Sequence, residues 1–140
     1  GMKKFCWIGL LAAITGLGSC LVEETGREPL KDLSEQMDVL AILQETIGQD
    51  MIRGDYAGAL QMARGMDSVF TICNKTFERH QRLKEPFRAY YEKKMEKAMG
   101  QLIKSLKKRD STASAGHYEY LVKRCNSCHN ENEVAERAHL

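Results

Sequence analysis

The stretch FRAYYEKKMEKAMGQLIKSL, residues 87–106, is the part of this sequence that decides its fold. Its apolar residues recur every three or four positions, which is the spacing of one face of an α-helix. Glutamate, lysine, alanine and glutamine fill the positions between them, and all four have a high helix propensity. The apolar face consists of Phe87, Tyr91, Met95, Ala98, Leu102 and Leu106. We therefore predict one amphipathic helix from Pro86 to Lys108.

Three further segments show the same pattern, and turn residues separate them. The spacing predicts a helix over residues 29–54, a second over residues 56–75, and a last one that begins near Asp110, Ser111 or Ser114 and ends shortly after His129. Four amphipathic helices joined by short connections bury their apolar faces best against one another. We predict an all-α fold, an antiparallel up-down four-helix bundle, over residues 30–140.

The last predicted helix carries Cys125-Asn126-Ser127-Cys128-His129, which has the spacing of a c-type haem attachment site. Two thiols at this spacing bond to the two vinyl groups of haem, and the adjacent histidine becomes an axial iron ligand. On a helix, positions i, i+3 and i+4 share one face. The motif predicts one covalent haem c, held by Cys125 and Cys128, with His129 as the proximal iron ligand.

Other chemistry is open to the same residues. A zinc site would use Cys125 and Cys128 with His139 or His117, but the sequence has no second Cys-x-x-Cys or His-x-x-x-His pair. A thioredoxin-like redox pair requires a βαβ setting, and nothing near the motif has a strand pattern. A structural disulfide between Cys125 and Cys128 is another alternative, but under it the position of His129 directly after Cys128 would be a coincidence.

The N-terminus predicts export. Lys3 and Lys4 precede an uncharged apolar run over residues 5–17, which is too short to span a membrane and is typical of a signal peptide. We expect residues 1–19 to be the signal peptide, with Gly1 a remnant of cloning.

The next residues, LGSC at 17–20, resemble a bacterial lipobox, with small residues before a cysteine. The resemblance implies that Cys20 is lipidated and that residues 20–29 tether a periplasm-facing domain to a membrane. The alternative is ordinary secretory cleavage, which gives a soluble periplasmic protein. Under either interpretation only Cys73 remains outside these sites, so the five cysteines do not form a disulfide framework.

Residues 30–135 resemble the cytochrome c′ family, including its low-spin relatives. The haem motif lies about ten residues from the chain end. GDYAGAL at 54–60 resembles the start of the family's second helix, and Met37 lies in the first predicted helix, where the family places a residue over the distal haem face. The resemblance implies a four-helix bundle and a possible homodimer through its first two helices.

The resemblance leaves two functions open. If Met37 is the sixth iron ligand, the haem is low-spin and carries out one-electron transfer with a periplasmic or membrane redox partner. If Met37 only packs in the core, as methionines commonly do, the iron is five-coordinate and binds gases such as nitric oxide or carbon monoxide. Arg124 is either a contact to a haem propionate or a solvated side chain.

A third function is a haem-free or zinc-bound helical lipoprotein that acts as an interaction module. Material made without a haem maturation system would also lack haem. No acid–base pair or nucleophile arrangement predicts an enzyme. An exported chain without nucleic-acid motifs does not predict nucleic-acid binding.

Charge is unevenly distributed within the net +2. Residues 20–74 hold four basic and ten acidic residues, whereas residues 75–109 hold twelve basic and four acidic residues. One interpretation is pairing between the two halves together with solvated faces. The other is a docking surface for an acidic redox partner.

Overall fold

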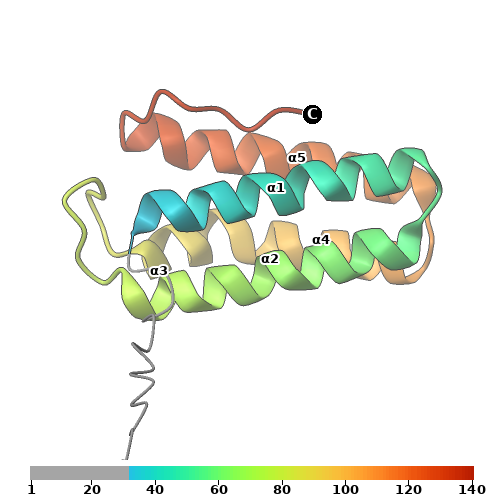
Figure 1. Cartoon of the computed structure of the whole chain (residues 1–140), viewed down its shortest axis with the longest axis horizontal. Helices are drawn as coiled ribbons and strands as arrows, with labels where there is room; N and C mark the ends of the chain where they lie inside the picture. The colour runs from blue at the N-terminus through green and yellow to red at the C-terminus, as the bar shows by residue number, and fades with distance from the viewer. Residues whose placement is uncertain (1–31) are drawn as a thin grey trace, which may run out of the picture.

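The computed structural model describes residues 32–140. The expected signal peptide, the lipidation site Cys20 and the tether lie outside these residues. Residues 32–140 form helices and connections and contain no strand, which confirms the all-α prediction. Figure 1 shows the long helices side by side, as in a helical bundle. The elements in order are α1 (Leu33–Ile52), α2 (Tyr56–Thr76), α3 (Phe87–Tyr90), η1 (Tyr91–Met95), α4 (Glu96–Lys107) and α5 (Ser111–Glu131).

Three aspartates start the long helices. Asp32, Asp55 and Asp110 are the N-caps of α1, α2 and α5, and each carboxylate accepts a hydrogen bond of 2.8–3.0 Å from a backbone N–H two or three residues later. This satisfies a donor that the first helical turn leaves free. The first helix therefore begins at Leu33 and not at Pro29, because Asp32 has an extended backbone and caps it.

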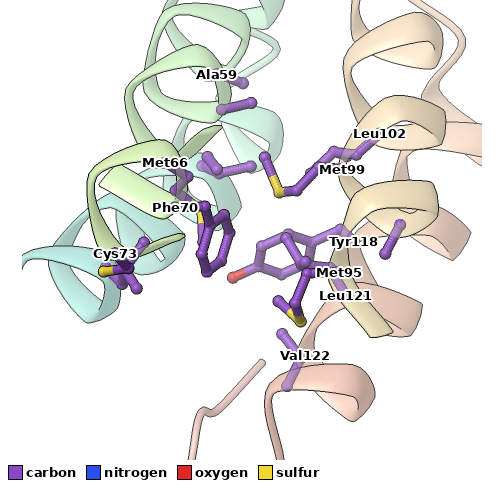
Figure 2. Packing of buried hydrophobic residues seen from close by; sticks show 14 of the residues in the cluster. Ala59, Met66, Phe70, Cys73, Met95, Met99, Leu102, Tyr118, Leu121 and Val122 are labelled. Carbon is purple, nitrogen blue, oxygen red and sulfur yellow. The ribbon is translucent and has the colours of Figure 1, made fainter. Parts of the chain in front are cut away.

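The core lies between the helices, and all the long ones contribute to it. In Figure 2, side chains of α2 lie opposite those of η1, α4 and α5. The predicted apolar face of residues 87–106 is confirmed, since five of its six members are buried and Tyr91 packs partly buried against them. Within residues 32–140, the apolar residues with no exposed surface are Ile47, Ala59, Ala63, Cys73, Ala98, Leu102 and Leu121.

The predicted helix over residues 86–108 is interrupted by a π-helical segment. The chain forms α3, then the wider turn η1, then α4. The guanidinium of Arg124 on α5 donates to the backbone carbonyls of Lys94 at 3.3 Å and Lys93 at 3.4 Å, both within η1. A π-turn adds one residue to the helix and loosens its hydrogen-bond ladder, and such turns are frequent at functional sites.

A loop over residues 78–86 links α2 to α3 and projects from one end of the molecule (Figure 1). Its base is closed by a backbone hydrogen bond of 3.0 Å from Phe87 to Phe77. The Oδ1 atom of Asn132, just after α5, accepts hydrogen bonds from the N–H of Lys84 at 3.0 Å and from the hydroxyl of Tyr90 at 3.1 Å. The loop therefore lies against the C-terminal end of α5.

No helix within residues 32–140 combines the length and apolar character needed to cross a bilayer.

Candidate functional site

The Cys-x-x-Cys-His motif lies on the last two turns of α5, so its cysteines and histidine are held by a regular helix. At about 100° per residue, Cys128, Cys125 and His129 fall within an arc of about 100° around the helix. Tyr118 and Leu121 fall in the same arc and are buried in the core. The motif therefore faces the inside of the molecule at one end. Its residues are only half-buried there.

The two motif thiols are free, and both cysteines are half-buried. Burial raises the pKa of the Cys125 thiol to about 12, and the neighbouring Cys128 adds to the rise. Burial also raises the pKa of Cys128, although the ammonium of Lys94 opposes this. Both thiols are therefore protonated at neutral pH, the form that adds S–H across a vinyl group. A metal ion would require them as thiolates.

His129 is held by the chain that follows it. Its Nδ1 atom lies 2.8 Å from the backbone carbonyl oxygen of Glu136. A carbonyl only accepts hydrogen bonds, so Nδ1 carries a proton and donates, and in the neutral imidazole Nε2 then keeps its lone pair. Metal-binding histidines are usually held in this way, with one ring nitrogen donating to a carbonyl or carboxylate and the other free for the metal.

The side of the motif next to η1 is tied to that segment. Lys94 is only 8% exposed, and its Nζ atom lies 2.7 Å from both the carboxylate of Glu131 and the hydroxyl of Ser127. Arg124 donates to the η1 carbonyls described above, and its guanidinium carbon lies 5.9 Å from the ring centre of Tyr120. Arg124, the possible propionate contact, is therefore half-exposed and bound to the backbone of η1.

Met37 lies on α1, partly buried, and packs against the core. Gln44 and Tyr118 join α1 to α5: the Tyr118 hydroxyl donates to the Gln44 carbonyl at 3.0 Å and accepts from its side-chain amide. Met37 is seven residues before Gln44, and Cys125 is seven after Tyr118. The start of α1 and the end of α5 lie at the same end of the molecule (Figure 1). Met37 is therefore at about the level of Cys125 along the bundle.

The residues of the zinc hypothesis are not gathered. Within residues 32–140 there is no group of three or more histidine, cysteine, aspartate or glutamate side chains that could hold a metal ion. His117 is half-buried near the start of α5, while His139 lies in the C-terminal segment, where its carbonyl accepts a hydrogen bond of 2.7 Å from Gln44. Haem c uses a different set of protein groups, with two thioether bonds and one imidazole.

Two shallow cavities lie beside the 78–86 loop. One, of about 380 Å³, is lined by this loop and by residues 132–136. The other, of about 410 Å³, is lined by the loop alone. Neither is lined by Cys125, Cys128 or His129. The two thiols and the imidazole have the chemistry and the common helix face that haem c attachment needs.

Sequence reasoning missed several residues around the motif. The sequence held a signal for Lys94, because positions 87, 91, 94 and 98 follow one helical face and a lysine among apolar residues requires a partner. The sequence could not indicate the contact from the carbonyl of Glu136 to His129, because every residue has a backbone carbonyl whatever its side chain.

No protein-family model, curated protein or solved structure matched this chain when each of the three groups was compared with it. The function is therefore inferred from the motif and from the contacts around it.

Proposed function

We propose that the protein is an exported monohaem c-type cytochrome, built as an antiparallel up-down four-helix bundle, that carries out one-electron transfer. The expected signal peptide would direct export, and lipidation of Cys20 would anchor the bundle to a membrane on the periplasmic side.

The observation that carries this proposal is the arrangement of Cys125, Cys128 and His129 on one face of α5, with Nδ1 of His129 already donating to a carbonyl. The two cysteines would bind the haem covalently and fix its plane against the helix. His129 would offer Nε2 to the iron. Haem, when bound, supplies a metal centre that gains and loses one electron. The core-facing position of the motif would limit the access of water, which is one factor that sets a reduction potential.

Gas binding is the second candidate, and the position of Met37 favours it. Met37 packs against the hydrophobic core, as an ordinary core methionine does. If it keeps this role, the sixth iron position stays open to nitric oxide or carbon monoxide. If its sulfur binds the iron, the position is filled and electron transfer is the function.

Surface charge supports an acidic redox partner. Within residues 32–140, no ion pair joins α1 or α2 to the basic segment 75–109; the lysines of that segment that form pairs bind Glu85, Glu131 and Glu133. The pairing of the first interpretation is therefore not found between the parts of the two halves that lie within residues 32–140. Exposed lysines of α4 and the turn after it are left facing solvent, where opposite charge steers transient encounters. These are Lys97, Lys104, Lys107 and Lys108.

A homodimer through α1 and α2 is part of the proposal. Ile42 and Ile52 on α1 are 65% and 88% exposed, and a partner copy would cover such apolar side chains. Light scattering on the exported protein should give twice the mass of one chain, and a single-chain mass at all concentrations would reject the dimer.

The test of haem attachment is export of the full chain in a host that matures haem c, followed by a denaturing gel stained for haem. We expect a stained band for the wild type and for Cys73→Ala, in which a buried cysteine outside the motif is removed. Cys125→Ala with Cys128→Ala should lose the stain. An unstained wild type, beside a stained control cytochrome from the same host, would refute the proposal.

The two functions are separated by absorption spectra with and without carbon monoxide. Electron transfer predicts a low-spin spectrum that carbon monoxide leaves unchanged in the wild type, and a high-spin, carbon-monoxide-sensitive spectrum in Met37→Leu. Gas binding predicts that the wild type itself is high-spin and shifts with carbon monoxide.

A further inference from the structure

The residues after α5 fold back along the motif. Residues 133–140, called here the C-terminal strap, run alongside α5 in Figure 1. The strap starts where the N–H of Val134 donates to the carbonyl of His129 at 2.9 Å. Chain ends are usually poorly ordered unless something ties them down.

The strap is tied by polar contacts to α5 and α1. The side-chain amide of Asn126 forms two hydrogen bonds with the backbone of Ala138: it donates to the carbonyl at 3.0 Å and accepts from the N–H at 2.8 Å. Arg137 donates to Oδ1 of Asn130 at 2.8 Å, and Gln44 donates to the carbonyl of His139 at 2.7 Å. These bonds fix the register of the strap along the helix.

With the strap in this register along α5, the carbonyl oxygen of Glu136 lies 2.8 Å from Nδ1 of His129. Asn126 and His129 are both motif residues, and they lie on the side of α5 away from η1. Apolar burial does not account for the strap, since Ala138 is the one strap residue in contact with the core and most of the others are exposed. Two of the strap's contacts reach His129 itself, from the N–H of Val134 and from the carbonyl of Glu136.

We propose that the C-terminal strap is a positioning segment for His129: it holds the imidazole as the Nδ1–H tautomer, directs Nε2 to the face shared with Cys125 and Cys128, and couples this orientation to α1 through Gln44. Asn126 is the positioning residue that sets its register. A hydrogen bond from Nδ1–H to a carbonyl makes the imidazole a stronger donor at Nε2. The tautomer does not depend on haem; the effect on iron rests on the function proposed above.

The tautomer is measured first, without haem. The full chain, labelled with ¹⁵N-histidine, is exported in a host that lacks haem c maturation and is studied by NMR in detergent; His129→Gln identifies the His129 signals. The wild type should show His129 as the Nδ1–H tautomer. A wild-type His129 with its proton on Nε2 overturns the proposal without any variant.

Two variants should remove the hydrogen bond between His129 and the carbonyl of Glu136, and one control variant should keep it. Asn126→Ala breaks the paired bonds to Ala138, and a stop codon after Val134 removes the strap. Each should lower the ratio of Nδ1–H to Nε2–H about fivefold or more, the factor expected for loss of one ordinary hydrogen bond. Glu136→Ala keeps the backbone carbonyl and should match the wild type. Unchanged ratios in both variants, at unchanged helix content, would overturn the proposal.

The haem-loaded protein gives the second readout. The reduction potential should rise in Asn126→Ala and in the truncated chain, because a weaker donor stabilises the oxidised iron less. It should stay at the wild-type value in Glu136→Ala. Equal potentials in all four proteins would overturn the effect on iron. If the wild type takes up no haem, the proposed function fails. The tautomer ratio measured by NMR still tests whether the strap positions His129.

Discussion

At the scale of single residues, the candidate site depends on side chains whose partners come from far along the sequence. Lys94 lies on an otherwise apolar face and is buried, and its charge is met by Glu131, thirty-seven residues later. A buried ammonium without such a partner would be strongly destabilising. The pairing therefore fixes how η1 lies against the motif helix.

Glu131 gives the site a pH dependence. The hydrogen bond from Lys94 lowers the pKa of Glu131 below its ordinary value of 4.5. A carboxyl group whose pKa is depressed on folding adds stability above the unfolded pKa and loses it as the pH falls through the folded pKa. We expect Glu131→Gln to be less stable than the wild type in urea at pH 7. The difference should shrink below pH 4.5 and vanish at lower pH; a constant difference across this range would contradict the pairing.

The motif thiols should be unreactive before haem is attached. With the pKa of Cys125 raised from 9.0 to about 12, its thiolate fraction at pH 8 is far below that of an exposed thiol. We expect alkylation of Cys125 by iodoacetamide in the folded, haem-free protein to be about 100-fold slower or more than in urea. Mass spectrometry of peptides would follow each cysteine. Equal rates in folded and unfolded protein would show that the thiol is not buried.

At the scale of elements, η1 is held by Arg124 as well as by its own backbone. Arg124→Ala should lower the free energy of unfolding by about 1 kcal/mol, because two hydrogen bonds to η1 carbonyls and the contact with Tyr120 are lost. Arg124→Lys keeps the charge without the planar donor group and should lose most of the same stability. Urea titration measures both. A lysine variant as stable as the wild type would show that charge alone matters.

The elements also show what the sequence could predict. The positions of the helices could be predicted from the spacing of apolar residues. The N-cap role of Asp55 could be predicted from its place after Gly54. Both signals are local in the sequence. The start of α1 was placed too early, since the cap at Asp32 outweighs the helix-starting preference of Pro29. The π-turn escaped prediction because one extra residue leaves three-to-four spacing nearly unchanged. The strap could not be predicted from the sequence, because most of its contacts are made by its backbone atoms.

At the scale of the whole molecule, side chains of all the long helices form the core, and Leu102 of α4 is fully buried in it (Figure 2). Leu102→Ala should destabilise the haem-free protein by about 2–5 kcal/mol, through lost burial and the cavity left behind. Lys104→Ala removes an exposed side chain of α4 and should change stability by less than about 0.5 kcal/mol. Thermal or urea unfolding compares the two. Equal losses would show that the core is not where the structure places it.

The central claim concerns the whole molecule, because it joins an export signal, a helical bundle and a haem motif in one chain. The most direct test is the haem stain of a denaturing gel of the full chain, exported with haem c maturation. We expect covalent haem that survives denaturation and that disappears when Cys125 and Cys128 are replaced by alanine. A wild-type band without haem, beside a stained control cytochrome from the same cells, would contradict it.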